Sequence, residues 1–365
     1  MKILEIISNL GNGGAEKLVV ELSNELTKTN KVTLVSFTNI EEWMFFPKNI
    51  NRYVNFIQLS KKKGFDVKLF RVLFLLLKNE KPDVVHIHLQ STLRYFLFLI
   101  PFFKKVQFVY TIHHALLPAK QSFKKFSKLW FFKKIKFVCL TNTIKQNFIE
   151  CFPNLNFLTI NNGVNHLVAS LESSQIKEEL KQYSVDNMSK IFLYVGRLSS
   201  TKNIPLLLNV FGEFSDKNIK LIIIGEDGSE DQENYKLVNN TSNKNIIYLG
   251  PKENIADYMY LSDALILTSR HEGMPIVVLE ALSVGLPIIS TPAGGMVDLV
   301  RNKVNGFLSA DITKESMVRA IKLFLELSIE EKDKISESNR VLFKSKYSIE
   351  NCAREYAKVF YNEYE

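Results

Sequence analysis

Cysteine is scarce in this chain of 365 residues, and its three cysteines share no C-x-x-C spacing. Neither a disulfide framework nor a zinc cluster is indicated, and a reducing compartment fits best. Long hydrophobic runs are also missing, because the most apolar stretch, residues 95–103, is about half as long as a membrane-spanning helix. The first eight residues contain Glu5 and no small-residue cleavage pattern. We therefore expect a first strand there, no signal peptide, and a cytoplasmic protein.

Glycine and proline, at 15 and 10 residues, are too few for a fibrous or linker-dominated chain. Disorder is excluded because 46% of the residues are hydrophobic and 12% are aromatic. The length is enough for two domains, each with its own core.

Carboxylates are absent from residues 84–149, a stretch that holds 11 lysines and arginines and 14 aromatic residues. Residues 1–168 carry 24 basic against 10 acidic side chains, whereas residues 169–365 carry 23 against 28. The basic and aromatic residues are densest in Lys120–Phe137, where seven lysines alternate with rings. This composition favours an anionic surface as a partner.

Short apolar runs alternate with longer amphipathic runs along most of the chain, which is the pattern of an α/β fold with parallel sheets. The pattern is interrupted by polar residues between Gly163 and Lys190, so we expect a domain boundary there. In such folds ligands bind outside the carboxyl ends of the strands. We predict strands over residues 2–8, 32–37, 83–88, 106–112, 137–141, 157–160, 191–195, 220–224, 246–249, 264–268 and 287–290.

Two motifs follow predicted strands and carry groups suited to phosphate. GNGGAEK, residues 11–17, opens a helix with Gly13 and Gly14, where the free N–H groups of a helix start can meet an anion. A tight turn would explain the same glycines. VGRLSSTKN, residues 195–203, places Arg197 and Lys202 after a strand. These two cations can clamp a diphosphate, although two solvated surface cations would give the same pattern.

The segment Ser269–Gly295 carries two carboxylates, Glu272 in a loop and Glu280 in the helix that Pro275 opens. The amides of Ile276 and Val277 lie in the first turn of that helix, where an anion can bind. Hydroxyl-binding carboxylates on either side of a phosphate site suit a nucleoside diphosphate sugar. The apolar neighbours of Glu280 argue against a solvent-exposed helix position.

These motifs, in this order and spacing, resemble glycosyltransferase family 4, whose members are retaining enzymes of the GT-B fold. The resemblance covers nearly the whole chain. It implies two Rossmann-like parallel-sheet domains facing across a cleft: residues 1–168 for the acceptor and residues 169–345 for the nucleotide-sugar. Residues 346–365 would form a helix that returns to the first domain.

The resemblance also assigns roles to individual residues. Arg197 and Lys202 would bind the donor diphosphate, with Gly13 and Gly14 approaching it from the other side. Glu272 would contact the transferred sugar and Glu280 the ribose. His113 would lie beside the donor sugar, although the adjacent His114 leaves the register open.

The remaining donor contacts are expected in the same segment, at Met274, Ile276 and Val277. Asp298 stands where the family usually has a glutamate, which weakens any assignment of the donor sugar. The sequence holds no D-x-D element, so we expect cations and helix starts, without a metal or other cofactor, to neutralise the diphosphate. His86 and His88 are expected to be structural.

The sequence therefore predicts a metal-independent hexosyl- or N-acetylhexosaminyltransferase that uses a nucleotide-sugar, most often a UDP-sugar in this family. The expected acceptor is a lipid-linked or membrane-proximal glycan of a bacterial polysaccharide or glycoconjugate pathway. Lys120–Phe137 would hold the protein on the inner face of the membrane. The alternatives are a nucleotide-sugar 2-epimerase of the same fold and a membrane-associated binding module; nucleic acid binding is not expected, because no such motif is present.

Overall fold

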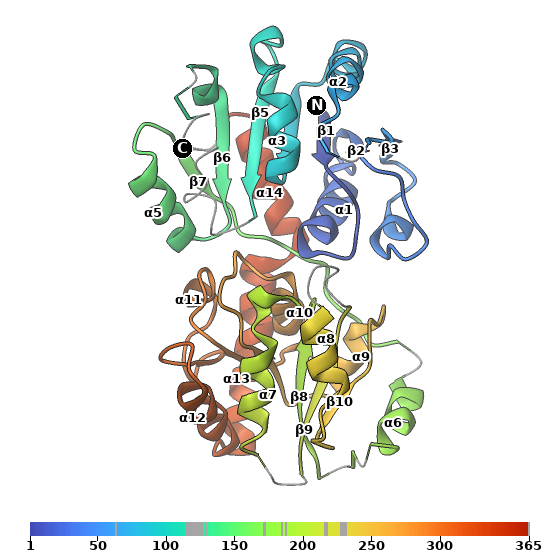
Figure 1. The fold of residues 1–365 in the computed structure, drawn as a ribbon. Helices are drawn as coiled ribbons and strands as arrows, with labels where there is room; N and C mark the ends of the chain where they lie inside the picture. The colour runs from blue at the N-terminus through green and yellow to red at the C-terminus, as the bar shows by residue number, and fades with distance from the viewer. Residues whose placement is uncertain are drawn as a thin grey trace. The chain divides into compact units, whose positions relative to one another are not determined.

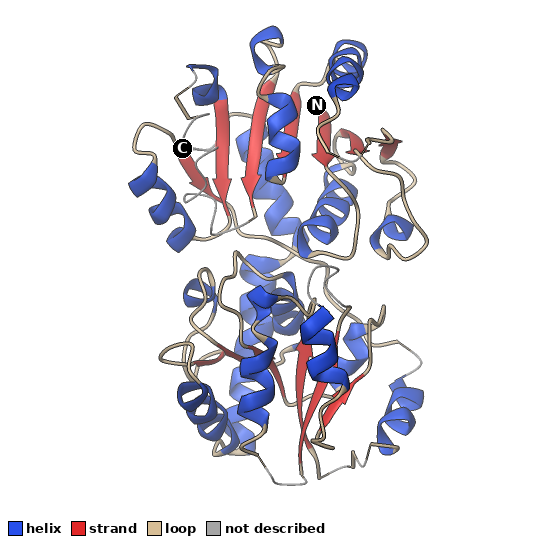
Figure 2. Ribbon diagram, viewed as in Figure 1, coloured by secondary structure: helices blue, strands red, loops and turns tan. Residues whose placement is uncertain are grey.

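The computed structural model describes residues 1–62, 64–113, 127–128, 130–170, 173–183, 185–186, 188–214, 218–226 and 232–363. They form two compact units. The first unit comprises residues 1–165 and 346–365, and the second comprises residues 166–345. Each unit is a parallel sheet with helices on both faces (Figure 2).

The first unit contains a seven-stranded sheet in the order β3-β2-β1-β4-β5-β6-β7 (Figure 1). Each recorded strand pairing in it is parallel. The strands are β1 (Lys2–Ile7), β2 (Lys31–Ser36), β3 (Asn55–Gln58), β4 (Val84–His88), β5 (Gln107–Ile112), β6 (Ile135–Cys139) and β7 (Phe157–Thr159). The α-helices are α1 (Gly14–Leu26), α2 (Val67–Glu80), α3 (Gln90–Phe96), α5 (Asn142–Cys151) and α14 (Ile349–Phe360), and the short 3₁₀ helices are η1 (Phe46–Asn49), η2 (Ile100–Phe102) and η4 (Trp130–Lys134).

The last helix, α14, belongs to the first unit although it comes at the end of the chain (Figure 1). Its entry is fixed by a backbone hydrogen bond from the Ile349 N–H to the Val164 carbonyl, at 3.0 Å. Gln107 on β5 donates to the carbonyl of Val359 at 2.7 Å. The predicted return of the C-terminal helix to the first domain is thus confirmed.

The second unit repeats the architecture with a six-stranded parallel sheet in the order β10-β9-β8-β11-β12-β13. Its strands are β8 (Lys190–Val195), β9 (Ile219–Ile224), β10 (Ile246–Tyr248), β11 (Ala264–Leu267), β12 (Ile288–Ser290) and β13 (Gly306–Leu308). Its helices are α6 (Ser173–Lys181), η5 (Ser200–Lys202), α7 (Ile204–Phe211), α8 (Gln232–Asn239), α9 (Ile255–Tyr260), α10 (Ile276–Val284), α11 (Met296–Leu299), α12 (Lys314–Leu325) and α13 (Ile329–Leu342), and a π-helical turn, Phe343–Tyr347, follows.

Continuously apolar strands form the cores, as the parallel-sheet prediction requires. In β9 the apolar run is Leu221–Ile224, of which Leu221, Ile222 and Ile223 are 0% exposed and Ile224 is 1% exposed. Burial of each such side chain contributes about 1.5–3 kcal/mol to folding. Two strands were not predicted, β3 and β13, because each is a short edge strand without an apolar run.

Candidate functional site

In the second unit an ion pair joins the loops that follow β8 and β11. The Lys202 ammonium lies 2.6 Å from Glu272 Oε1. The Glu272 side chain is 9% exposed and the Lys202 side chain 23% exposed. Arg270 links the same two loops, since its N–H donates to the Thr201 carbonyl at 2.8 Å. Residues 70 positions apart in the sequence therefore form one cluster at the carboxyl ends of neighbouring strands.

Glu272 is held from a second side by Ser269, whose hydroxyl donates to the same carboxylate oxygen at 2.6 Å. Tyr194, at the end of β8, is fully buried. Burial and the negative charge of Glu272 raise the pKa of Tyr194 well above its ordinary value. Its hydroxyl donates to the Arg197 carbonyl at 3.1 Å and so shapes the turn that carries Arg197. Sequence reasoning missed both Ser269 and Tyr194, which carry no motif of their own.

The glycine pair after β12 packs directly on the backbone of Glu272. The Gly295 N–H donates to the Glu272 carbonyl at 3.1 Å. Gly294 has φ +55°, and a Cβ atom added there would clash with that carbonyl oxygen. Glycine is thus required at position 294 by both its conformation and its surroundings. The pair sets the position of the loop that presents Glu272.

The other predicted donor contacts of the second unit fall into two groups. Arg197 is exposed, and Lys202 Cε lies 3.9 Å from the position that a Cβ atom on the adjacent Gly196 would take. The second group is buried on or before α10. Glu280 is 3% exposed, Met274 4% and Ile276 6%, while Val277 is half-buried. The burial of Glu280 excludes the solvent-exposed helix position, which was the alternative at that residue.

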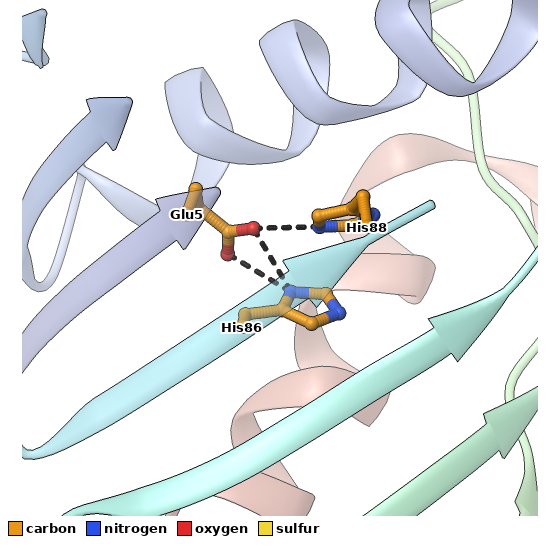
Figure 3. Close-up of side chains that lie close together, drawn as sticks. All are labelled: Glu5, His86 and His88. Atoms are coloured by element: carbon orange, nitrogen blue, oxygen red, sulfur yellow. Dashed lines mark hydrogen bonds and ion pairs between the residues drawn. The ribbon is translucent and has the colours of Figure 1, made fainter. Parts of the chain in front are cut away.

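In the first unit three side chains from β1 and β4 meet in the core (Figure 3). Glu5 Oε2 lies 2.9 Å from His86 Nδ1 and 2.9 Å from His88 Nε2, and all three side chains are 0% exposed. Burial raises the pKa of Glu5, but the attraction and hydrogen bonds of His86 and His88 outweigh it and lower this pKa to about 2. Burial, together with the charge of His86, lowers the pKa of His88 to about 4.

These shifts determine where the protons lie. Because Glu5 is ionised, the Nε2–H of His88 donates to it, and a neutral His88 then has a bare Nδ1. That Nδ1 lies 3.0 Å from Nε2 of His113, the residue after β5. His113 therefore donates from Nε2 to His88. The structure thus joins half-buried His113 to Glu5 through His88, whereas the adjacent His114 lies outside the described residues.

Two histidines and a carboxylate can also ligate a metal ion, and the ligand atoms of Glu5, His86 and His88 lie within 4.8 Å of one another. Their donors and acceptors are already engaged, however. The remaining ring nitrogen of His86 lies 2.8 Å from Thr111 Oγ1, which in turn lies 2.7 Å from the Tyr356 hydroxyl. The cluster therefore fits a hydrogen-bonded network better than an ion site.

The glycine-rich turn after β1 begins α1, with Gly13 at the N-cap and Gly14 as the first helical residue. A Cβ atom added to Gly13 would clash with the carboxylate of Glu16. Glu16 lies in the first turn of α1, where a carboxylate interacts favourably with the helix dipole. Sequence reasoning missed this residue. The carboxylate of Glu16 therefore occupies the space that a side chain at position 13 would need.

The predicted membrane stretch, Lys120–Phe137, is only partly described, because residues 120–126 and 129 lie outside the described residues. Phe132 and Phe137 are 0% exposed, and Lys136 donates to the Val359 carbonyl at 3.1 Å and to Asn362 Oδ1 at 2.7 Å. The prediction that Phe132 and Lys136 face a membrane is wrong, whereas Phe137 was expected to begin a strand. Lys136 lies within β6, which begins at Ile135, two residues before the predicted strand. Phe132 lies in η4, where its ring contacts that of Phe137 with centroids 5.0 Å apart.

Family models match both units. The model described as "Glycosyltransferase Family 4" matches residues 12–166, and the model described as "Glycosyl transferases group 1" matches residues 175–341. The chain carries a glycosyltransferase family 4 domain followed by a glycosyl transferases group 1 domain. This pair of domains confirms the resemblance read from the motifs, and it does not favour the epimerase alternative.

Named relatives of this glycosyltransferase point the same way. The chain is 28% identical over 294 residues, 76% of its length and 73% of the relative, to the Escherichia coli UDP-Gal:alpha-D-GlcNAc-diphosphoundecaprenol alpha-1,3-galactosyltransferase. It is 26% identical to the capsular polysaccharide biosynthesis glycosyltransferase CapM of Staphylococcus aureus, over 67% of each chain.

The fold agrees with a solved structure over its whole length. Anabaena HepE in complex with UDP and glucose superposes with a TM-score of 0.83 at 17% identity, covering 99% of this chain and 100% of HepE. The predicted GT-B fold class is confirmed. Among the described residues, none of the helices combines the length and apolar character that crossing a bilayer requires.

Proposed function

We propose that the second unit binds a nucleotide-sugar, with UDP-sugars as the first candidates. The enzyme would transfer the sugar, a hexose or N-acetylhexosamine, to a lipid-linked or membrane-proximal glycan in bacterial polysaccharide or glycoconjugate biosynthesis. The observation that carries this proposal is the Lys202–Glu272 pair at 2.6 Å, which places a cation and a buried carboxylate together at the ends of β8 and β11.

Lys202 can serve the donor phosphate without releasing Glu272. An ammonium has three N–H donors, and Glu272 uses one of them. The other two, with the exposed guanidinium of Arg197, would bind the diphosphate. Negative charge grows on this group as it leaves, so cations held in place lower the barrier to transfer. The diphosphate is then neutralised by this chain's own residues, and transfer would proceed without added metal.

Two carboxylates would bind hydroxyl groups at the ends of the donor. Glu272 is fixed by Lys202 and Ser269 and would accept hydrogen bonds from the transferred sugar. Glu280, buried on α10, would accept from the ribose. The first-turn amides of Ile276 and Val277 would face the phosphates between them. His113 of the first unit would contact the donor sugar, in the tautomer that His88 imposes.

Transfer would proceed with retention of configuration. The bond between the anomeric carbon and the phosphate oxygen breaks as the acceptor oxygen bonds to the same face of that carbon, and the acceptor proton passes to the leaving phosphate. The E. coli relative, whose name specifies a UDP-sugar donor and a diphosphoundecaprenol-linked acceptor, supports this choice of substrates. An acceptor of that class would place the enzyme on the cytoplasmic face of a membrane.

A transfer assay with UDP-, GDP- and ADP-sugars and a synthetic diphosphoundecaprenol-linked monosaccharide tests the proposal. We expect a disaccharide from one donor class, with the donor's anomeric configuration retained by NMR and with unchanged yield in EDTA. An inverted anomer would contradict the mechanism. A free 2-epimer formed from donor alone would instead support the epimerase alternative.

A further inference from the structure

An apolar surface covers the outer side of α2 and the adjoining α3–η2 segment. Six large side chains there are 36–71% exposed: Phe65, Val72, Phe74, Leu75, Phe98 and Phe102. We call these six residues the α2 surface. On a water-soluble protein, contiguous apolar patches of this kind mark interaction sites, whereas single exposed residues need no explanation.

The pattern of α2 explains why its outer side is apolar. Leu69, Leu73 and Leu77, spaced four residues apart, are the residues that α2 buries against the unit. An amphipathic helix would place polar residues on the opposite side. On α2 the exposed side does carry Lys68, Arg71 and Lys78. Val72 and Leu75 are exposed among them, at 42% and 44%. Helix α2 therefore exposes apolar side chains that do not pack within the first unit.

Ring contacts hold the aromatic members of the α2 surface in place. Phe65 stacks on buried Tyr95 with ring centroids 5.2 Å apart, and Phe70 bridges Phe65 to Phe98 at 5.5 and 5.7 Å. Phe74 contacts Phe102 at 6.1 Å. These contacts restrict the rotamers that the rings can adopt, so docking would cost less side-chain entropy.

Basic side chains surround these rings. Six are exposed on α2, α3 and the segment after η2: Lys68, Arg71, Lys78, Arg94, Lys104 and Lys105. The carboxylate of Asp66 is engaged as the N-cap of α2, accepting from the Lys68 N–H at 3.0 Å, and residues 84–149 contain no carboxylate. The α2 surface therefore combines phenylalanines with a positively charged rim.

We propose that the α2 surface docks on a bilayer that contains anionic phospholipid, with its phenylalanines in the interface and its cations among the head groups. Protein interfaces are depleted of lysine, whereas phenylalanine beside lysine and arginine is typical of interfacial membrane binding. A second copy paired about a two-fold axis would bring the same cations together, which disfavours it. This inference rests on the membrane location proposed above, but assigns it to residues other than Lys120–Phe137.

Co-sedimentation of the full chain with vesicles of phosphatidylglycerol and phosphatidylcholine, compared with pure phosphatidylcholine, tests the proposal. We expect binding only to the anionic vesicles, weakened by salt. The variants Phe98→Ser/Phe102→Ser and Arg71→Glu/Lys78→Glu should each lose about tenfold or more in affinity. Ile329→Ser/Val341→Ser, at exposed apolar positions of the second unit, is the matched control and should bind as the wild type does.

The variant Lys133→Glu/Lys134→Glu, at exposed positions of the earlier predicted stretch, distinguishes the two surfaces. Its affinity should change by less than about twofold. The proposal is overturned if this variant alone loses vesicle binding, if the α2 variants bind as the wild type does, or if the wild type forms a dimer that they dissolve. UDP binding, measured separately by thermal shift, should be equal in all variants. Its absence would contradict the donor site without affecting the α2 surface.

Discussion

Two buried carboxylates, Glu5 in the first unit and Glu272 in the second, differ in the side chains that hold them. Glu5 is 0% exposed and is held by two imidazoles on the neighbouring strand β4. The Glu272 side chain is 9% exposed and is held by an ammonium on a flexible stem and by a hydroxyl. A ligand can share the partner of Glu272, because Lys202 has donors to spare. The partners of Glu5 cannot be shared in this way, because both ring nitrogens of His86 and of His88 are already engaged.

Glu5 orients the histidines beside it, whereas Glu272 lies where a donor would bind. Glu5 fixes the proton of His88, and through it the tautomer of His113, while remaining inside the sheet. Glu272 stands in a loop after β11, next to the cation that would meet a phosphate. Removing the Glu5 carboxylate should therefore mainly lower the stability of the fold, whereas removing the Glu272 carboxylate should mainly weaken donor binding.

The largest expected effect comes from Glu5→Gln. The amide presents N–H groups toward a ring N–H and removes the charge that both histidines are arranged around. We expect the free energy of unfolding to fall by about 3–5 kcal/mol. Urea denaturation measures this loss. Glu330→Gln, at a pair whose side chains are 72% and 79% exposed, is the matched control and should change stability by less than about 1 kcal/mol. Equal stability of the two variants would contradict the role of Glu5.

The pH dependence of stability should follow the same network. The pKa of His88 is about 4 in the folded chain and 6.5 ordinarily, so as pH falls from 6.5 to 4 the unfolded chain takes up a proton that the folded chain does not. We expect a loss on the order of 3 kcal/mol over that range. Glu5, with its pKa lowered from 4.5 to about 2, should add a further loss below pH 4.5. Unfolding curves that coincide between pH 7 and pH 4 would exclude a neutral buried His88.

A smaller effect is expected at the glycine that positions Glu272. Gly294→Ala should cost about 1–3 kcal/mol and weaken donor binding, because the new Cβ meets the Glu272 carbonyl at φ +55°. Gly64→Ala is the matched control, since Gly64 has φ +80° but no heavy atom within 4 Å of an added Cβ. Thermal unfolding and a donor titration of both variants separate backbone strain from the clash. If Gly64→Ala weakens donor binding as much as Gly294→Ala does, the contact between Gly294 and the Glu272 carbonyl does not position the donor site.

The Lys202–Glu272 cluster of the second unit was easier to predict from the sequence than the Glu5–His86–His88 network of the first unit. Arg197, Lys202 and Glu272 each follow a strong buried strand, and the carboxyl ends of parallel strands meet at one edge. The structural role expected of His86 and His88 agrees with their burial. Their contact with Glu5 was missed because Glu5 lies 81 residues before His86 and meets it only through the register that pairs β1 with β4. A lone glutamate in KILEII and two histidines in VVHIH were the available signal.

The basic aromatic stretch shows the limit of composition. Lysines and rings in Lys120–Phe137 indicated a surface, yet Phe132 and Phe137 are core residues. Conversely, α2 carries no motif that marks it as a surface, and only the packing of Leu69, Leu73 and Leu77 reveals that its other apolar residues are exposed. Which side of an apolar helix faces the core depends on tertiary contacts that periodicity alone does not specify.

The central claim, that Lys202 and Glu272 form the donor site, is tested most directly by calorimetric titration of Lys202→Ala with the nucleotide-sugar that supports transfer. Lys334→Ala, which removes the lysine of an exposed Lys–Glu pair in the same unit, is the matched control. We predict that the dissociation constant rises about 10- to 100-fold in Lys202→Ala, the loss of a hydrogen bond to a charged group, and is unchanged in Lys334→Ala. Equal affinities in the two variants would contradict the account.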